Sequence, residues 1–304
     1  MTSRETSQTA IRLRALPGVV HRMMRHPASS PSRIGFIKIL WRFGAWQVQK
    51  RLDPRPRVCT VFGDARLVCH PDNAASNAVL YFDQPDWPEM GLLRLALRPG
   101  DTFLDVGANV GVYSVLAWSR VKPTGRVIAI EAEPAVRSRL TENFRINGMN
   151  PKDILAVAVG EKDGMVPFTV GRDCLGRIAT ESERDTLPVP VRRLDGLVGS
   201  DSANVVIGKI DIEGMELPAL RGGAELLRRG TPKCWIVETN GLENRSELSA
   251  FLAEHGFLLF EAAGDGSILR HVPPNGPFPM NSIAVGDMDW LRARVPTLRI
   301  VASK

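Results

Sequence analysis

Two acidic residues and two glycines form the clearest chemical pattern in the sequence. Asp105 ends a short apolar run, and Gly107 and Gly111 follow it. Glycine lets the backbone approach a ligand closely, and the helix expected after Gly111 offers unpaired N–H groups at its start. A second apolar run ends on Glu131, where a carboxylate can accept hydrogen bonds from two ribose hydroxyls. The pattern predicts a nucleoside site.

The spacing of the glycines narrows the choice of ligand. Gly-x-x-x-Gly differs from the Gly-x-Gly-x-x-Gly of dinucleotide sites, so this loop is not suited to binding a pyrophosphate. Asp105 would repel phosphate but attract a cationic amino acid group. Together with Glu131, it favours S-adenosylmethionine, an adenosyl ligand that carries a positive amino acid. The alternative is that both acids only cap loops, and their pairing at this spacing makes the ligand the better interpretation.

A second group of charged residues follows the predicted strand 205–210. Alternation along an extended chain places Lys209, Asp211 and Glu213 on one face, at the edge of the sheet where ligands bind. We expect Asp211 to be the general base, with burial raising the pKa of its carboxyl. Glu213 is the second choice, and Lys209 would orient either one. A purely structural polar cluster is nearly as well supported for Glu213 and Glu216.

A magnesium ion is a further alternative in this region. Asp211, Glu238 and Asn240 would offer three oxygen ligands from neighbouring strand ends. No short motif demands a metal, so the metal-free interpretation is preferred. The four cysteines have no Cys-x-x-Cys spacing, which leaves a zinc site unsupported.

Apolar runs predict the elements that position these groups. We expect a Rossmann-like α/β fold with a seven-stranded, mostly parallel sheet, one antiparallel strand and helices on both faces. A small β insertion should follow the third strand, with strands at 165–170 and 187–191 on either side of a polar stretch at 172–185. The seven strands are expected at 102–106, 126–130, 154–159, 205–210, 235–237, 258–261 and 282–285.

These motifs resemble the FkbM-type methyltransferases over roughly residues 90–240. The resemblance rests on Leu-Asp-Val-Gly-Ala-Asn-Val-Gly at 104–111, on Lys-Ile-Asp-Ile-Glu-Gly-Met-Glu at 209–216, and on Glu131, Asn143, Arg-Leu-Asp at 193–195 and Glu238. Ala132 departs from it, because the family commonly has proline there.

The resemblance implies a class I S-adenosylmethionine-dependent methyltransferase, usually one that acts on an oxygen atom. It places the methionine side of the donor in the glycine loop, the ribose on Glu131, the adenine beside Val159 and Gly160, and the reacting centre beside Asp211 and Glu213. The implied donor-binding residues are Asp105, Gly107, Ala108, Asn109, Gly111, Glu131, Ala132, Val159, Gly160 and Asp211. The acceptor would be a small molecule, a glycan or a lipid-like compound. A non-catalytic adenosyl-binding or membrane-associated scaffold, or a nicotinamide-dependent oxidoreductase, is the alternative.

Charge is distributed unevenly along the 304 residues, whose net charge is +6. Residues 1–57 hold 12 basic and two acidic residues, whereas the remainder holds 27 basic and 31 acidic residues. The basic excess therefore belongs to an N-terminal arm, and no nucleic-acid partner is indicated for the catalytic body. We expect four parts: an extension at 1–57, a lead-in and pocket cover at 58–97, the methyltransferase domain at 98–290 and a tail at 291–304.

Within the arm, residues 34–48 combine aromatic and aliphatic residues with Lys38 and Arg42. This segment is too short and too interrupted to span a bilayer. A helix packed on the domain is the preferred interpretation, and peripheral membrane contact is the alternative. Residues 1–32 lack the apolar core of a secretory signal. We expect a cytoplasmic protein, with the inner face of a membrane as the alternative location; the oligomeric state is not indicated.

Overall fold

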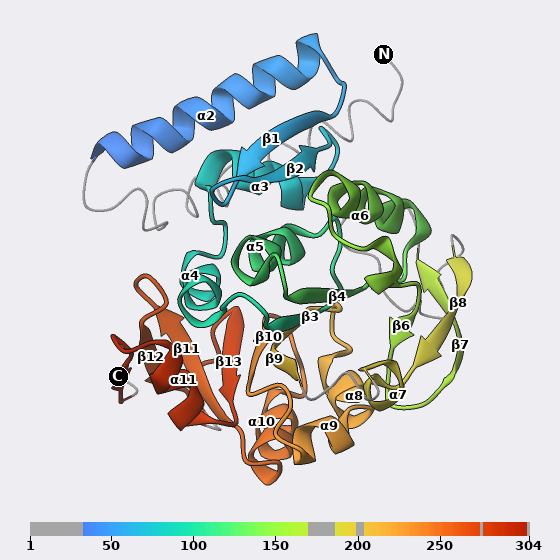
Figure 1. The fold of residues 1–304 in the computed structure, drawn as a ribbon, viewed down its shortest axis with the longest axis vertical. Coiled ribbons are helices and arrows are strands. Elements are labelled where there is room, and N and C mark those ends of the chain that lie inside the picture. Colours follow the sequence, from blue (N-terminus) through green and yellow to red (C-terminus); the bar gives the residue numbers. More distant parts are fainter. Residues whose placement is uncertain (1–32, 170–185, 199–203, 274–275, 303–304) are drawn as a thin grey trace.

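A nine-stranded mixed sheet forms the centre of the fold (Figure 1). The computed structural model describes residues 33–169, 186–198, 204–273 and 276–302. The strands lie in the order β14-β12-β11-β13-β10-β9-β3-β4-β5. Their bounds are β3 (Thr102–Val106), β4 (Arg126–Ile130), β5 (Ile154–Leu155), β9 (Val205–Ile210), β10 (Cys234–Glu238), β11 (Leu258–Ala263), β12 (Ile268–His271), β13 (Asn281–Val285) and β14 (Arg299–Val301).

The α/β fold and its mostly parallel core agree with the sequence analysis. Strands β5, β4, β3, β9 and β10 run parallel, and β13 lies antiparallel to both β10 and β11. The sheet has the seven expected strands and two more, because β12 and β14 extend the edge beyond β11. Both are short segments of three or four residues, too short for an alternating apolar pattern to be recognised.

The third predicted strand divides between two sheets. Ile154 and Leu155 form β5 in the main sheet, whereas β6 (Ala158–Val159) pairs with β8 (Thr186–Arg192). β8 pairs in turn with β7 (Gly164–Thr169), which gives a three-stranded sheet in the place of the predicted β insertion. The whole polar stretch predicted between its strands, residues 172–185, lies outside the described residues, as do residues 1–32.

Helices cover both faces of the sheet because neighbouring strand residues point to opposite sides. Phe103 contributes to the hydrophobic core on one face, with residues of α4 (Trp87–Ala96), α5 (Val112–Val121), α6 (Pro134–Ile146) and α11 (Met288–Arg294). Leu104 contributes to the core on the other face. The helices on that face are α7 (Leu194–Val198), α8 (Glu216–Arg221), α9 (Ala224–Arg228) and α10 (Arg245–Glu254). Figure 1 shows α5 and α6 above β3 and β4, and α8, α9 and α10 below them.

The N-terminal elements lie on the α5–α6 side of the fold. Helix α2 (Arg33–Leu52) crosses the top of the view in Figure 1, beyond the hairpin of β1 (Arg57–Val61) and β2 (Ala65–Cys69) and helix α3 (Ala74–Phe82). Ala65 and Leu67 of β2 belong to the same hydrophobic core as Phe103. The proposed division into four parts stays a prediction.

Candidate active site

The loop after β3 requires glycine because a second loop passes very close to it. Gly107 has φ +78°, and a Cβ there would lie 1.9 Å from the carbonyl oxygen of Asp211. The absence of a side chain therefore lets the loop after β9 approach the loop after β3. Gly111 also has a positive φ and begins α5, where a Cβ would lie 2.6 Å from Leu140.

Glu131 joins the glycine loop to the end of β4. One carboxylate oxygen accepts a hydrogen bond of 2.9 Å from the Asn109 backbone N–H, and the other accepts one of 2.8 Å from the Glu133 N–H. Burial raises the pKa of Glu131 to about 7. The side chain is thus fixed in position, and each oxygen keeps acceptor capacity for a ligand hydroxyl.

A cavity of about 610 Å³, including the open solvent at its mouth, lies between these loops and the three-stranded sheet. The lining residues are Val106, Gly107, Asn109, Ile130, Glu131, Ala132, Glu133, Val136, Val157, Ala158, Val159, Phe168, Asp211, Ile212, Glu213 and Met215. Four of these residues are acidic, and none of the described lining residues is basic.

The cavity brings together six of the predicted donor-binding residues, and the others lie outside its lining. Ala108 and Gly111 shape the loop, and the backbone N–H of Gly160 donates to the carbonyl of Arg192 in the three-stranded sheet. Asp105 is buried and accepts a hydrogen bond of 2.6 Å from the Ser114 hydroxyl. Burial raises its pKa, and its Oδ1 atom has no hydrogen-bond partner among the described residues. Its role in binding an amino acid group stays a prediction.

Lys209 and Asp211 form an ion pair of 2.7 Å at the end of β9. Burial alone would raise the pKa of Asp211, but the Lys209 ammonium and a hydrogen bond with Glu238 outweigh it, so the pKa lies below its ordinary value. Burial, followed by the charge of Asp211, raises the pKa of Glu238 to about 9. At neutral pH Asp211 is therefore ionised, and Glu238 carries the proton that they share. The sequence analysis expected burial to raise the pKa of the general base, and Asp211 does not meet that condition.

The acidic group around Asp211 differs in one member from the predicted metal set. Asp211, Glu213 and Glu238 each offer an oxygen atom within 4.8 Å of the others, whereas Asn240 is exposed and does not belong to the group. Such oxygens could hold a hard divalent cation. Lys209 and the shared proton already balance part of the negative charge, so a metal would have to displace that proton.

Glu216 has a structural role that the sequence left open. Its Oε1 atom accepts hydrogen bonds from the backbone N–H groups of Ile212, at 2.9 Å, and Gly214, at 3.3 Å. The side chain is fully buried. It therefore fixes the loop that carries Asp211 and Glu213, and Glu213 itself adopts a positive φ of 56° there.

A polar group from α4 and α5 adjoins Lys209, and the sequence analysis did not identify it. The Lys209 ammonium lies 4.7 Å from the centre of the Tyr113 ring, and the Tyr113 hydroxyl donates to Asp86 at 2.9 Å. Burial, followed by the charge of Asp86, raises the pKa of Glu89 to about 7. The signal for Asp86 and Glu89 was the mixture of acidic and aromatic residues within the segment 58–97, for which the sequence predicts only a lead-in and pocket cover.

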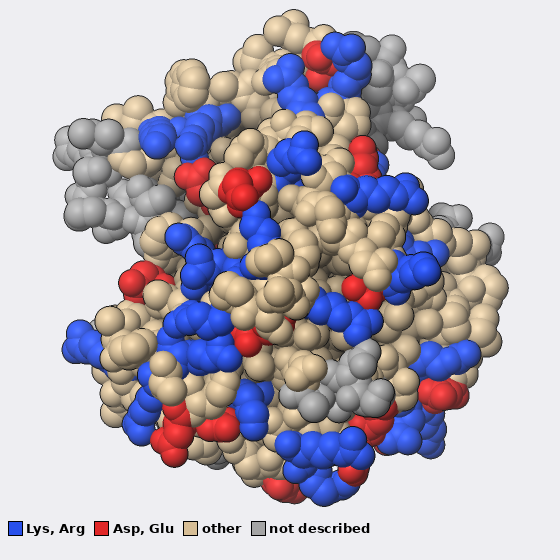
Figure 2. Space-filling view, in the orientation of Figure 1, with Lys and Arg blue, Asp and Glu red and all other residues tan. Residues whose placement is uncertain are grey.

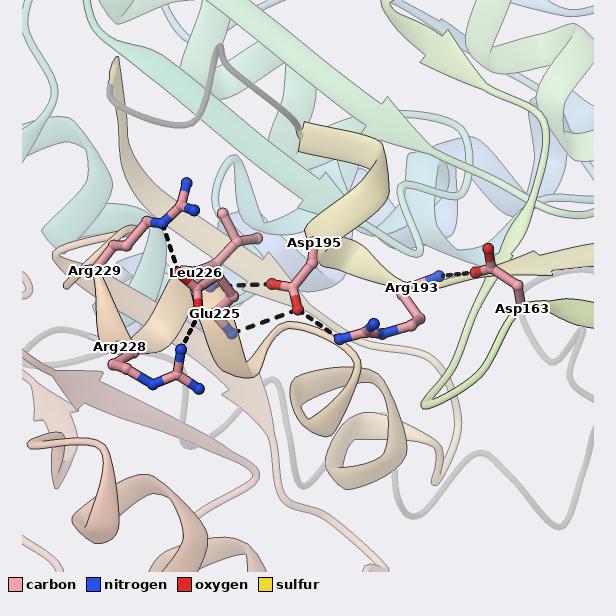
Figure 3. A network of polar contacts seen from close by, with 7 residues as sticks. All are labelled: Asp163, Arg193, Asp195, Glu225, Leu226, Arg228 and Arg229. Carbon is pink, nitrogen blue, oxygen red and sulfur yellow. Dashed lines mark hydrogen bonds and ion pairs between the residues drawn. The ribbon is translucent and has the colours of Figure 1, made fainter.

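Two other motif residues stabilise the framework around the site. The buried Asn143 side chain accepts from the Val68 N–H at 2.7 Å and donates to the Val110 carbonyl at 2.8 Å, which joins the hairpin to the glycine loop. Asp195 accepts from the backbone N–H of Leu226 at 3.0 Å, at the start of α9 (Figure 3). Arg193 donates to Asp195 at 2.9 Å and, through its backbone N–H, to Asp163 at 2.8 Å.

Comparison with protein families gives one assignment. The family model described as the methyltransferase FkbM domain matches residues 105–259, about half of the chain. The chain belongs to the FkbM methyltransferase family. The matched region contains the glycine loop, Glu131, the Lys209–Glu216 segment and Glu238. It does not contain Asp86, α2 or the hairpin.

Solved structures with similarity to this FkbM-family chain are distant in sequence. An FkbM methyltransferase from Methylobacillus flagellatus KT has 17% sequence identity to this chain and a TM-score of 0.42. The match covers 81% of this chain and 59% of the Methylobacillus protein, so this chain spans less than two thirds of that protein's length. An S-adenosylmethionine-dependent O-methyltransferase from Thermotoga maritima has 13% identity and a TM-score of 0.37, covering 66% and 64%.

A third solved structure is Aeropyrum pernix fibrillarin, which contains S-adenosyl-L-methionine. It has 13% identity and a TM-score of 0.36, covering 64% and 72% of the two chains. No curated protein matches the sequence.

Proposed function

We propose that this FkbM-family protein transfers the methyl group of S-adenosylmethionine to a hydroxyl oxygen of a glycan, a lipid-linked compound or a natural product. The charge of the cavity is the observation that supports the donor most strongly. Its lining contains Glu131, Glu133, Asp211 and Glu213, and no basic residue among those described. This surface suits a cationic ligand and disfavours a dinucleotide, whose phosphates need basic groups or helix N–H groups.

The residues present fit such a donor. Glu131 is fixed by two backbone N–H groups and would accept hydrogen bonds from the ribose hydroxyls. Apolar side chains near Val159 and Phe168 would contact the adenine, and the acidic groups near Asp211 would lie close to the positive end. When bound, S-adenosylmethionine supplies a methyl carbon that its sulfonium group has already activated.

The acidic cluster would orient the acceptor and receive its proton. Lys209 and the proton on Glu238 keep Asp211 ionised, so Asp211 can accept a hydrogen bond from an acceptor hydroxyl. As the hydroxyl oxygen bonds to the methyl carbon, the carbon–sulfur bond breaks, the sulfur leaves as a neutral thioether, and the hydroxyl proton becomes strongly acidic. A carboxylate of low pKa can then take it, and positioning supplies most of the remaining rate enhancement.

Titration calorimetry tests the donor site. S-adenosylmethionine and S-adenosylhomocysteine should bind with micromolar affinity, and Glu131→Ala should weaken binding at least 30-fold, on the order of 2 kcal/mol for lost charge-assisted hydrogen bonds. Glu254→Ala, which removes an exposed carboxylate on α10, is the matched control and should change nothing. Binding of NADH in place of both adenosyl ligands would overturn the proposal.

A methyl-transfer assay tests the reaction. The protein is incubated with methyl-labelled S-adenosylmethionine and separate lipid and glycan extracts, and Asp211→Asn should abolish the incorporated label. Labile label would indicate a methyl ester. Label that survives mild base would exclude an ester, and mass spectrometry of the product should then show a methyl ether and not an N-methyl group. Donor binding without any transfer would favour an adenosyl-binding scaffold. We propose a cytoplasmic location, with which the free thiols of Cys59, Cys69 and Cys234 are compatible.

A further inference from the structure

Helix α2 has apolar side chains on two opposite faces, and only one of them packs against the protein. The inner face lies on Tyr81 and Phe82 of α3, and the ring centres of Phe43 and Tyr81 are 5.1 Å apart. Its residues are Phe36, Ile39, Phe43 and Trp46, spaced by three or four positions. This face explains why the helix is held on the body of the protein, as the sequence analysis preferred.

The outer face of α2 is also apolar, but it is exposed. Trp41 is 71% exposed and Leu52 82% exposed. The outer face consists of Ile37, Leu40, Trp41, Val48 and Leu52. At about 1.5 Å per residue these side chains follow a helix roughly 30 Å long. A contiguous exposed apolar surface of this kind marks an interaction site.

The charges of α2 indicate the type of partner. The helix contains five basic residues and no acidic residue. Lys38 and Arg51 are exposed beside the outer face. Arg55 and Arg57 follow the end of the helix, where both form ion pairs with Asp53. Figure 2 shows Lys and Arg side chains over this part of the molecule. A second copy of α2 would bring like charges together, whereas an anionic surface would complement them.

We propose that the outer face of α2 binds the surface of an anionic lipid membrane. The helix would lie in the plane of the interface, with Trp41 and its aliphatic neighbours inserted and the basic residues among the lipid head groups. No helix in the described parts of the chain has the length and apolar character needed to cross a bilayer. The surface lies outside the region that matches the methyltransferase family, and the proposal does not depend on the proposed reaction.

Vesicle sedimentation with the full-length protein tests this proposal. The protein should bind vesicles of equal parts phosphatidylglycerol and phosphatidylcholine at low salt, and binding to pure phosphatidylcholine should be at least tenfold weaker. The double variant Ile37→Ser, Trp41→Ser should bind the anionic vesicles at least tenfold more weakly. Leu258→Ser removes another exposed apolar residue, on β11, and is the control; this variant should bind as the wild type does.

Substitution is preferable to deletion because removing residues 1–57 would expose Tyr81 and Phe82. Circular dichroism and adenosyl-ligand titration of the double variant should match the wild type, so the outcome is independent of the donor site. Three results would each overturn the proposal. The first is that the protein binds neutral and anionic vesicles equally, or binds neither. The second is that the double variant binds anionic vesicles as strongly as the wild type. The third is that the wild type is a dimer in sedimentation velocity and the double variant is a monomer.

Discussion

The protonation state of Glu131 should control how nucleosides bind. The pKa of this carboxyl is about 7 in the free protein because the side chain is buried. Ribose hydroxyls donate hydrogen bonds, and they bind the ionised carboxylate better than the neutral acid. With this pKa, roughly one tenth of the molecules are ionised at pH 6 and roughly nine tenths at pH 8. The dissociation constant should therefore be about tenfold larger at pH 6 than at pH 8.

Adenosine is the best probe for this effect, because it carries the ribose but no titrating amino group. Calorimetry at pH 6, 7 and 8 should show the tenfold change, and binding should release roughly nine tenths of a proton at pH 6 and roughly one tenth at pH 8. Glu131→Gln cannot ionise, so it should bind more weakly and show a flat profile. Glu89 also has a pKa of about 7 but does not line the cavity. A flat wild-type profile, or a Gln variant that keeps the pH dependence, would refute this explanation.

Three further changes test other parts of the site. Gly107→Ala should lower the free energy of unfolding in urea titrations by about 2–3 kcal/mol, because the added methyl group would meet the Asp211 carbonyl. Gly148 has a similar φ but open space around it, so Gly148→Ala should lower it by only about 1 kcal/mol. Equal losses in the two variants would contradict the close approach of the two loops. Lys209→Met should raise the pKa of Asp211 and lower kcat at least 100-fold, on the order of 3 kcal/mol, because it removes the ion pair that keeps Asp211 ionised. The dissociation constant for the donor should stay within threefold of the wild-type value. An unchanged kcat would show that Lys209 does not support the reaction through Asp211. Glu238 has its pKa raised from 4.5 to about 9, so the stability it contributes is complete below pH 4.5 and is lost as the pH rises towards 9. Glu238→Gln should remove this loss, and its Tm relative to wild type should rise with pH; a constant difference would count against the raised pKa.

Much of the framework could be predicted because the relevant signals are local. The apolar run 102–106, the glycine turn and the position of Glu131 correspond to β3, its loop and the end of β4. Strand alternation also predicted that Asp211 and Glu213 share a face. Their oxygen atoms do lie together, but both residues belong to the loop after β9, where Glu213 has a positive φ, so an extended strand is not the reason. Short strands such as β14 were missed because three residues carry no recognisable period.

The electrostatic state of the site could not be predicted, because it depends on groups that are distant in the sequence. Asp86, Tyr113 and Glu238 come from three elements and meet around Lys209 and Asp211. Their contacts determine which carboxyl is ionised and why the pKa of Asp211 is lowered. The two-faced pattern of α2 was equally ambiguous, because either apolar face alone satisfies the spacing of a packed helix.

A crystal structure of the protein with S-adenosylhomocysteine would test the central claim most directly. We predict that the ligand occupies the cavity between the loops after β3, β4 and β9, with both ribose hydroxyls within hydrogen-bonding distance of the Glu131 carboxylate. Its sulfur atom should face the cluster of Asp211 and Glu213. A ligand bound elsewhere, or one whose ribose points away from Glu131, would contradict the proposed donor site.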